Sequence, residues 1–358
     1  MKETRMFALI FIAALLVMGM LAACGGSDSP VIFGTVFFAG NDGVHGGELW
    51  KTDGTEAGTM MVADINESGD SYPHGFEQLN GRVYFGADDG IHGVELWASD
   101  GTEAGTVMVA NISDLGGSNP SDLTAFNGKI YFRADDGIHG SELWASDGTE
   151  AGTAIVADIY DFSGSYPYYF AALNGKIYFS ADDGIHGQEL WATDGTEAGT
   201  VMVANISDSG SSSPQYLTAF NGKIYFGADD GIHGIELWAT DGTEAGTVMI
   251  ANINDSGDFN PYGFTALGGN LYFGADDGIH GNELWATDGT EAGTVMIANI
   301  NDPGGSRPNR LQYVNGRIAF GATSTGEGYE LWVTDGTEAG TMMIDILPGA
   351  LSGYFIPG

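Results

Sequence analysis

The sequence is poor in several features that would otherwise suggest a function. It has one cysteine, Cys24, which excludes a disulfide framework. It has 11 lysines and arginines against 48 aspartates and glutamates, so the formal net charge is −37. Nucleic-acid binders need a basic surface, and anionic lipids attract basic segments, so the charge argues against both partners. The sequence also has no Gly-x-Ser-x-Gly elbow, which leaves nucleophilic catalysis with little support.

Tryptophan occurs seven times, and every interval is 47 residues. A fixed internal period of this length is the signature of a repeat architecture and overrides length as a guide to domain count. The seven positions are Trp50, Trp97, Trp144, Trp191, Trp238, Trp285 and Trp332.

One repeat shows four short segments with the composition of β-strands, as residues 214–253 illustrate. Residues 216–220 are apolar, and Asn221-Gly222 is a strong hairpin signal because a type I′ turn needs positive φ twice. Residues 223–228, 236–240 and 247–253 follow, separated by glycine-rich turns and rich in β-formers. The repeat therefore predicts an antiparallel meander of four strands.

Four antiparallel strands repeated seven times are typical of a β-propeller. The strands are nearly continuous apolar runs, as expected for sheets covered on both faces. We therefore predict an all-β fold in which residues 31–358 form a seven-bladed β-propeller of four-stranded antiparallel blades. The first repeat lacks most of its own first strand, and residues 351–356 stand where a further first strand would begin. This C-terminal strand is predicted to complete the first blade and close the ring.

The amino terminus has the pattern of a secretory signal. Lys2 and Arg5 precede an apolar run, and Leu21-Ala22-Ala23-Cys24 follows it. This ending resembles the bacterial lipobox. The resemblance implies a signal peptide at 1–23, lipid attachment at Cys24 and a tether at 24–30. It further implies a membrane anchor through that lipid, export, and a place at the bacterial outer membrane or cell surface, since Gly25 rather than Asp follows the cysteine.

The octet Glu-Leu-Trp-x-x-Asp-Gly-Thr occurs in every copy and resembles the bacterial ELWxxDGT repeat. The resemblance covers nearly all of residues 31–347 and implies an exported, often lipid-anchored protein, but no known reaction. The seventh copy departs from the pattern, because residues 322–330 lack the aspartate pair and the histidine found in earlier copies.

Acidic turns suggest a possible metal site. Consecutive turns of a meander alternate ends, so the Asp-Asp-Gly-Ile-His-Gly turns and the proline-containing loops should share one end of each blade. Oxygen-rich acidic loops suit calcium, whereas an aspartate before glycine also caps a turn by accepting backbone amides. Both interpretations stay open. The candidate metal residues are Asp88, Asp89, Asp135, Asp136, Asp182, Asp183, Asp229, Asp230, Asp276 and Asp277. The histidines of these turns are expected to pack within the turn, and the tryptophans to form interblade core.

The positions that differ between copies carry the functional prediction. They concentrate in the proline-containing loops, where aromatic residues and one arginine pair suit a glycan, peptide or protein ligand. The candidate ligand-binding residues are Tyr72, His74, Tyr166, Tyr168, Tyr169, Tyr216, Phe259, Tyr262, Arg307 and Arg310. We therefore expect a non-catalytic binding or scaffold module. The alternatives are a calcium-stabilised structural or adhesive protein, and a hydrolase or lyase acting at the channel mouth.

Overall fold

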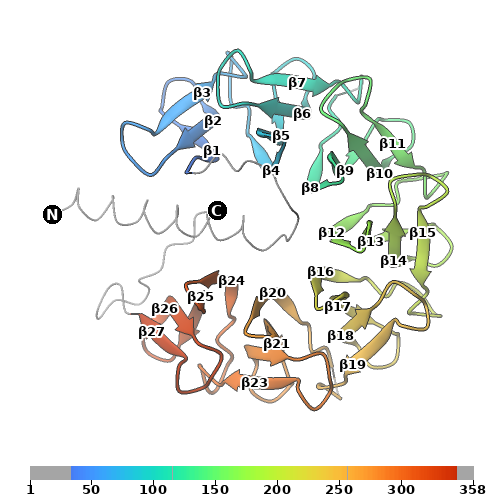
Figure 1. Ribbon diagram of the computed structural model, residues 1–358, viewed down its shortest axis with the longest axis vertical. Coiled ribbons are helices and arrows are strands. Elements are labelled where there is room, and N and C mark those ends of the chain that lie inside the picture. The colour runs from blue at the N-terminus through green and yellow to red at the C-terminus, as the bar shows by residue number, and fades with distance from the viewer. Residues whose placement is uncertain (1–33, 115, 256, 345–358) are drawn as a thin grey trace. The chain divides into compact units, whose positions relative to one another are not determined.

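The structure is a computed structural model that describes residues 34–114, 116–255 and 257–344. The predicted signal peptide (1–23), Cys24, the tether (24–30) and the closing strand (351–356) lie outside the described residues. Within the described residues every regular element is a β-strand, and the strands form seven antiparallel sheets (Figure 1). The prediction of an all-β repeat protein is therefore confirmed.

Six sheets contain four strands in chain order, and the first sheet contains β1–β2–β3. The first strands of the four-stranded sheets are β4 (His74–Leu79), β8 (Ser121–Phe126), β12 (Tyr168–Leu173), β16 (Gln215–Phe220), β20 (Tyr262–Leu267) and β24 (Asn309–Val314). The second strands are β1 (Val36–Asn41), β5 (Arg82–Asp88), β9 (Lys129–Asp135), β13 (Lys176–Asp182), β17 (Lys223–Asp229), β21 (Asn270–Asp276) and β25 (Arg317–Ser324).

The third strands carry the Glu-Leu-Trp motif. They are β2 (Gly47–Thr52), β6 (Val94–Ser99), β10 (Ser141–Ser146), β14 (Gln188–Thr193), β18 (Ile235–Thr240), β22 (Asn282–Thr287) and β26 (Gly328–Thr334). The fourth strands are β3 (Met60–Ala63), β7 (Val107–Ala110), β11 (Ala154–Ala157), β15 (Val201–Ala204), β19 (Val248–Ala251), β23 (Val295–Ala298) and β27 (Met342–Ile344).

The chain divides into two compact units. Strands β1–β12 belong to the first unit and β16–β27 to the second, whereas the residues of β13–β15 are divided between them. Within the first unit, β4 contacts β8, and β8 contacts β12. Within the second unit, β16 contacts β20, and β20 contacts β24.

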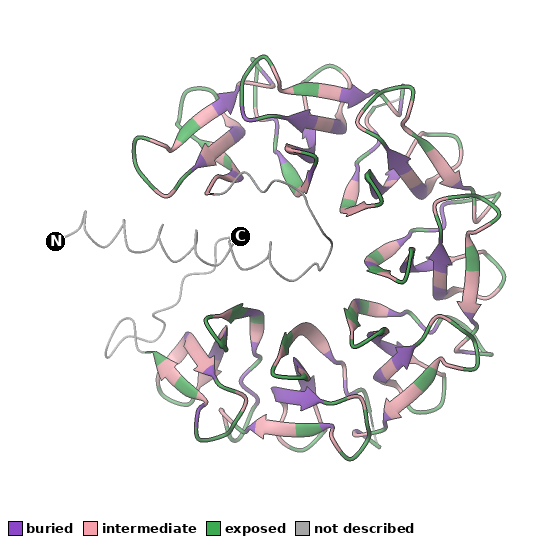
Figure 2. Cartoon of the chain, in the orientation of Figure 1, coloured by how far each residue is buried: buried purple, intermediate pink, exposed green. Residues whose placement is uncertain are grey.

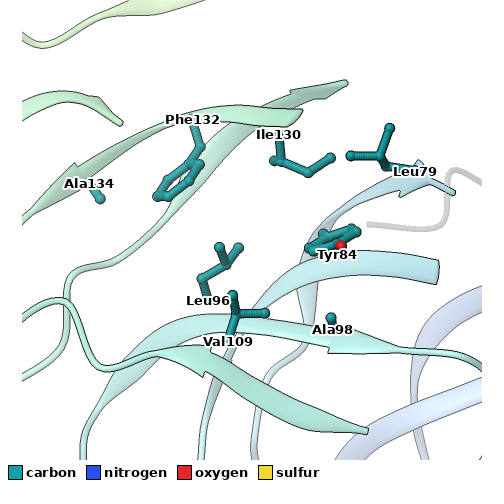
Figure 3. Packing of buried hydrophobic residues seen from close by; sticks show 8 residues of the cluster. All are labelled: Leu79, Tyr84, Leu96, Ala98, Val109, Ile130, Phe132 and Ala134. Atoms are coloured by element: carbon teal, nitrogen blue, oxygen red, sulfur yellow. The ribbon is translucent and has the colours of Figure 1, made fainter. Parts of the chain in front are cut away.

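The core lies between successive sheets, and burial is concentrated in the second and third strands (Figure 2). In the first unit, Leu96 of β6 and Ile130 and Phe132 of β9 are fully buried in one cluster (Figure 3). Trp144 packs against this cluster. In the second unit, Trp332 packs against a cluster that contains Leu284 of the preceding sheet. For these tryptophans the predicted role as core between sheets is confirmed.

The hairpin turns follow the sequence signals closely. Asn221 has φ of 48° and Gly222 has φ of 77°, the left-handed pair that a type I′ turn requires. A second irregularity recurs where the first strand pairs with the second strand. In β8 the register shifts between Ser121 and Thr124, and Asp122 within that shift has φ of 57°. This is a β-bulge, a feature that re-aims a side chain.

Candidate functional site

The segments that join the fourth strand of one sheet to the first strand of the next are here called the proline loops. Each is held by a buried glutamate of the preceding third strand. In the first unit, Glu95 accepts hydrogen bonds from the amides of Ile112 (3.0 Å), Ser113 (3.2 Å) and Ser118 (3.0 Å), and from the Ser118 hydroxyl (2.6 Å). One carboxylate therefore ties down both ends of the loop.

The same arrangement recurs along the chain, because the glutamate belongs to the Glu-Leu-Trp motif. In the second unit, Glu283 accepts from the amides of Ile300 (2.9 Å), Asn301 (3.1 Å) and Ser306 (3.0 Å). These glutamates have at most 1% of their surface exposed: Glu48, Glu95, Glu142, Glu189, Glu236, Glu283 and Glu330. Burial raises the pKa of the Glu142 and Glu236 carboxyls from the usual 4.5 to about 7.

A buried residue in each proline loop also bonds to the next sheet. The Ser118 carbonyl accepts a hydrogen bond from the Asp135 amide at 2.9 Å, so Ser118 links β6 to β9. Phe259 occupies the equivalent position, and its carbonyl accepts from the Asp276 amide at 2.8 Å. The Phe259 side chain is fully buried and lies 5.0 Å from the Trp285 ring, centroid to centroid. The prediction that Phe259 binds ligand is therefore wrong: the position is interior in every repeat in which it is described, and the residue is core.

The Asp-Asp-Gly-Ile-His-Gly turns lie at the same end of each sheet as the proline loops, as predicted. In the first unit, Asp88 accepts from the Gly90 amide at 2.7 Å, and Asp89 accepts from the amides of Ile91 (2.9 Å) and His92 (2.8 Å). The second carboxylate oxygen of Asp89 lies 2.7 Å from Nδ1 of His92. The histidine is thus held within its own turn, and both aspartates cap backbone amides.

The capping pattern repeats wherever the contacts are described. Asp135 and Asp136, Asp229 and Asp230, and Asp276 and Asp277 make the same bonds, and Asp182 and Asp183 accept from the amides of Gly184 and Ile185. In the part of the chain that the structure describes, no group of three or more histidine, cysteine, aspartate or glutamate side chains gathers as a metal site would require. The geometry therefore shows the capping role of these carboxylates directly.

Six of the candidate ligand-binding residues have left-handed backbone, which only glycine adopts without strain. They occupy two recurring positions beside the prolines. The residue before the proline is Tyr72 (φ 47°), Asn119, Tyr166 (47°), Ser213, Asn260 or Arg307 (52°). The second residue after the proline is Gly75, Asp122, Tyr169 (61°), Tyr216 (57°), Gly263 or Arg310 (52°). The tyrosines at these positions are exposed, Tyr72 by 65% and Tyr166 by 46%.

In the first unit, the structure brings two predicted residues together with one that sequence reasoning missed. The Arg133 guanidinium lies 4.1 Å from the centroid of the Tyr168 ring, and Tyr168 lies 6.3 Å from Tyr169. Arg133 comes from β9, in a strand position that holds Gly86, Gly227, Gly274 and Gly321 in other repeats. This replacement is visible on internal comparison of the repeats, and it was the signal that could have found the residue.

The first unit also contains Tyr72 and His74. The Tyr72 hydroxyl donates to Asp70 at 2.8 Å, and Nδ1 of His74 lies 2.9 Å from the Tyr72 carbonyl oxygen. In the second unit, Tyr216 and Tyr262 lie 6.2 Å apart, centroid to centroid. Burial raises the pKa of the Tyr262 hydroxyl above its usual range, and the neighbouring Arg307 opposes this shift. Tyr329, which sequence reasoning did not select, donates to the side-chain oxygen of Asn309.

The described residues contain no helix long and apolar enough to cross a membrane. No family model matches the sequence. No curated protein matches it either.

Solved structures show the fold to which the chain is similar. A computationally designed protein, Ika8, is 15% identical with a TM-score of 0.55, over 90% of this chain and 85% of that chain. Puromycin hydrolase is 14% identical with a TM-score of 0.56, over 93% of this chain and 56% of that chain. A prolyl endopeptidase structure is 12% identical with a TM-score of 0.56, over 89% and 49%. The chain thus spans about half the length of the two hydrolases. The sheet topology and these likenesses fit a β-propeller-like repeat fold.

Proposed function

We propose that this protein is a non-catalytic binding module, tethered at the bacterial cell envelope by lipid on Cys24. The observation that carries the binding role is the set of large side chains in left-handed backbone beside the prolines. A residue held in such a conformation costs about 1–3 kcal/mol. Gly75 and Gly263 show that the fold accepts glycine at one of these positions, yet Tyr169, Tyr216 and Arg310 stand there in other copies. Retaining bulky side chains against this cost supports a role for the side chains themselves.

The positions suit recognition because the proline loops beneath them are rigid. Glu142 and Ser165 hold the loop of Tyr166 to two sheets. Glu283 and Ser306 do the same for the loop of Arg307, so these side chains are displayed on a fixed backbone. Preorganised aromatic and arginine side chains are typical of binding surfaces. The ligand is a glycan, a peptide or a protein.

Arrays of glycans and peptides probed with the full chain in mild detergent test this role. We expect selective binding that is lost when Tyr166, Tyr169, Tyr216 and Arg310 are replaced together by Asn, Gly, Gly and Gly, residues that other repeats carry there. Turnover of a test substrate with no binding on any array would favour the hydrolase or lyase alternative instead. Incorporation of labelled palmitate, with Cys24→Ala as control, tests the anchor.

A further inference from the structure

The cluster around Arg133 lies entirely within the first unit. Arg133 comes from β9, Ser121 and Asp122 from β8, and Tyr168 and Tyr169 from β12. Strand β8 contacts β12, which brings the three strands to one place beside the proline loops.

Arg133 is held in one orientation by its neighbours. Its guanidinium stacks on the Tyr168 ring at 4.1 Å, and its Nε donates to the Ser121 hydroxyl at 3.0 Å. The side chain is 20% exposed. A guanidinium has five N–H donors, and within the described residues Ser121 is the acceptor that it reaches at hydrogen-bond distance. The remaining donors are available to a ligand.

Asp122 supplies acceptors beside these donors. Its Oδ2 lies 4.0 Å from Nη2 of Arg133, which is too long for a hydrogen bond. Its side chain is 33% exposed, and its backbone has φ of 57°. A fixed donor and a fixed acceptor therefore stand side by side. The Tyr169 ring, which is 38% exposed, lies 6.3 Å from the Tyr168 ring on which the guanidinium stacks.

The residues that face each other on the first and second strands of a sheet are complementary in size. Where the second strand has glycine, a larger side chain lies over it: a Cβ on Gly86 would meet the His74 ring at 2.8 Å, and one on Gly274 would meet the Tyr262 ring at 2.5 Å. Opposite Arg133 stands the small Ser121 instead. The arginine thus has room because its cross-strand neighbour is small.

The chemistry of the cluster selects among ligand classes. The acidic chain, with a net charge of −37, and Asp122 itself disfavour an anionic ligand, while Arg133 disfavours a cationic one. A sugar hydroxyl both donates and accepts, so adjacent hydroxyls of a pyranose match an arginine donor beside a carboxylate acceptor. The apolar face of the same ring packs on an exposed aromatic side chain, as Tyr169 offers.

We propose that Arg133, Asp122 and Tyr169 form a subsite for one ring of a neutral oligosaccharide, with Tyr168 holding the arginine in place. This inference rests on the proposed binding function and assigns it a ligand class and a location.

The test uses titration calorimetry on the full chain in mild detergent. The probes are neutral hexasaccharides of glucose, xylose, mannose and N-acetylglucosamine, with hexagalacturonate as the anionic comparison. We expect at least one neutral probe to bind. Arg133→Gly and Tyr169→Gly should each weaken it at least tenfold, because each removes a direct contact.

The melting temperature separates binding from folding. Other repeats carry glycine at both positions, and Tyr169→Gly also relieves positive φ, so the melting temperature of this variant should be unchanged or higher. The controls Tyr313→Ala and Arg317→Asn change an exposed tyrosine and an exposed arginine of the second unit to residues that the preceding repeat carries there, and they should leave the Kd of the neutral probe within about twofold.

Each opposing outcome has a separate meaning. Binding of a neutral probe that Arg133→Gly and Tyr169→Gly do not weaken would overturn this site and leave the binding function standing. Binding of hexagalacturonate alone, or of peptides alone on the arrays, would overturn the ligand class. Absence of binding to every hexasaccharide, glycan and peptide would overturn both the subsite and the proposed function.

Discussion

The carboxylate of Glu95 accepts hydrogen bonds from both the amide and the hydroxyl of Ser118, at 3.0 Å and 2.6 Å. The glutamate belongs to the repeated Glu-Leu-Trp motif, and the serine belongs to the loop that leads into the next sheet. This pair connects the motif that is the same in every repeat to the loop whose sequence differs most between repeats.

Replacing this glutamate should destabilise the fold. In Glu95→Gln an NH₂ group takes the place of one acceptor oxygen. Either the Ile112 amide, which faces Oε2, or the Ser113 and Ser118 amides, which face Oε1, then lose their acceptor in a buried place. We expect the free energy of unfolding to fall by about 1–3 kcal/mol at pH 8, measured by urea denaturation. The control is Glu103→Gln, which changes an exposed glutamate of the same repeat and should stay within about 0.5 kcal/mol of wild type.

Stability should fall as the pH rises through the range 4.5 to 7. The pKa of Glu142 and Glu236 is about 7 in the folded protein against 4.5 ordinarily, because burial disfavours the charged form. Between these values the native state binds more protons than the unfolded state, so each group weakens stability by at most about 1.4 kcal/mol per pH unit. The contribution is complete below pH 4.5 and lost above about 7.

Urea midpoints at pH 5 and pH 8 check this, and Glu236→Gln should show a smaller difference between the two. An equal difference in wild type and variant would contradict the assignment. At lower pH the opposite effect begins, because the hydrogen bond from the His45 amide lowers the pKa of Asp42 to about 2. The stability that this aspartate contributes is lost as the pH falls from 3.8 towards 2.

Truncating the core between sheets should cost more than truncating the exposed turn. Phe132 is fully buried, so Phe132→Ala should lower the free energy of unfolding by about 3–5 kcal/mol. Ile138, in the same repeat, is 81% exposed, and Ile138→Ala should change stability by less than about 0.5 kcal/mol. Thermal denaturation of both variants would measure the two changes in stability. Similar losses for the two would contradict the assignment of Phe132 to the core.

Removing calcium should leave the melting temperature unchanged. The aspartate pairs, for example Asp88 and Asp89, already accept backbone amides within their own turn. A calcium site filled at a hundred times its Kd would add about 2.7 kcal/mol. Differential scanning calorimetry in calcium and in excess chelator distinguishes these cases. A fall of several degrees in chelator would favour the calcium-stabilised alternative and direct attention back to these carboxylates.

Much of the fold could be predicted because its signals are local. In the repeat 214–253 the predicted strands 216–220, 223–228 and 236–240 match β16, β17 and β18 to within one residue at each end, and only the fourth strand was overlong. Asn221-Gly222 sets the hairpin through its own backbone preference, which does not depend on tertiary contacts.

The candidate site was predicted less completely, because burial and cross-strand contacts are not local properties. The position of Phe259 is serine in the five other proline loops, and a phenylalanine there looks like a displayed surface residue, but the link between neighbouring sheets places it in the interior. Arg133 lies in a strand that reads as core, and only its neighbour Tyr168, 35 residues further along the chain, gives it a role.

The 47-residue period, the strands, the turns and the acidic charge follow from composition and backbone preference, so they could be predicted from the sequence alone. Contacts between segments far apart in the chain determine which variable side chains are displayed and which are buried. The tertiary structure also makes six glutamates of the Glu-Leu-Trp motifs the anchors of loops that begin 17 residues later, as Glu95 does for Ile112. They are Glu48, Glu95, Glu142, Glu189, Glu236 and Glu283. The physical reason is that a buried carboxylate is stable only when donors surround it, and those donors come from segments that meet only on folding.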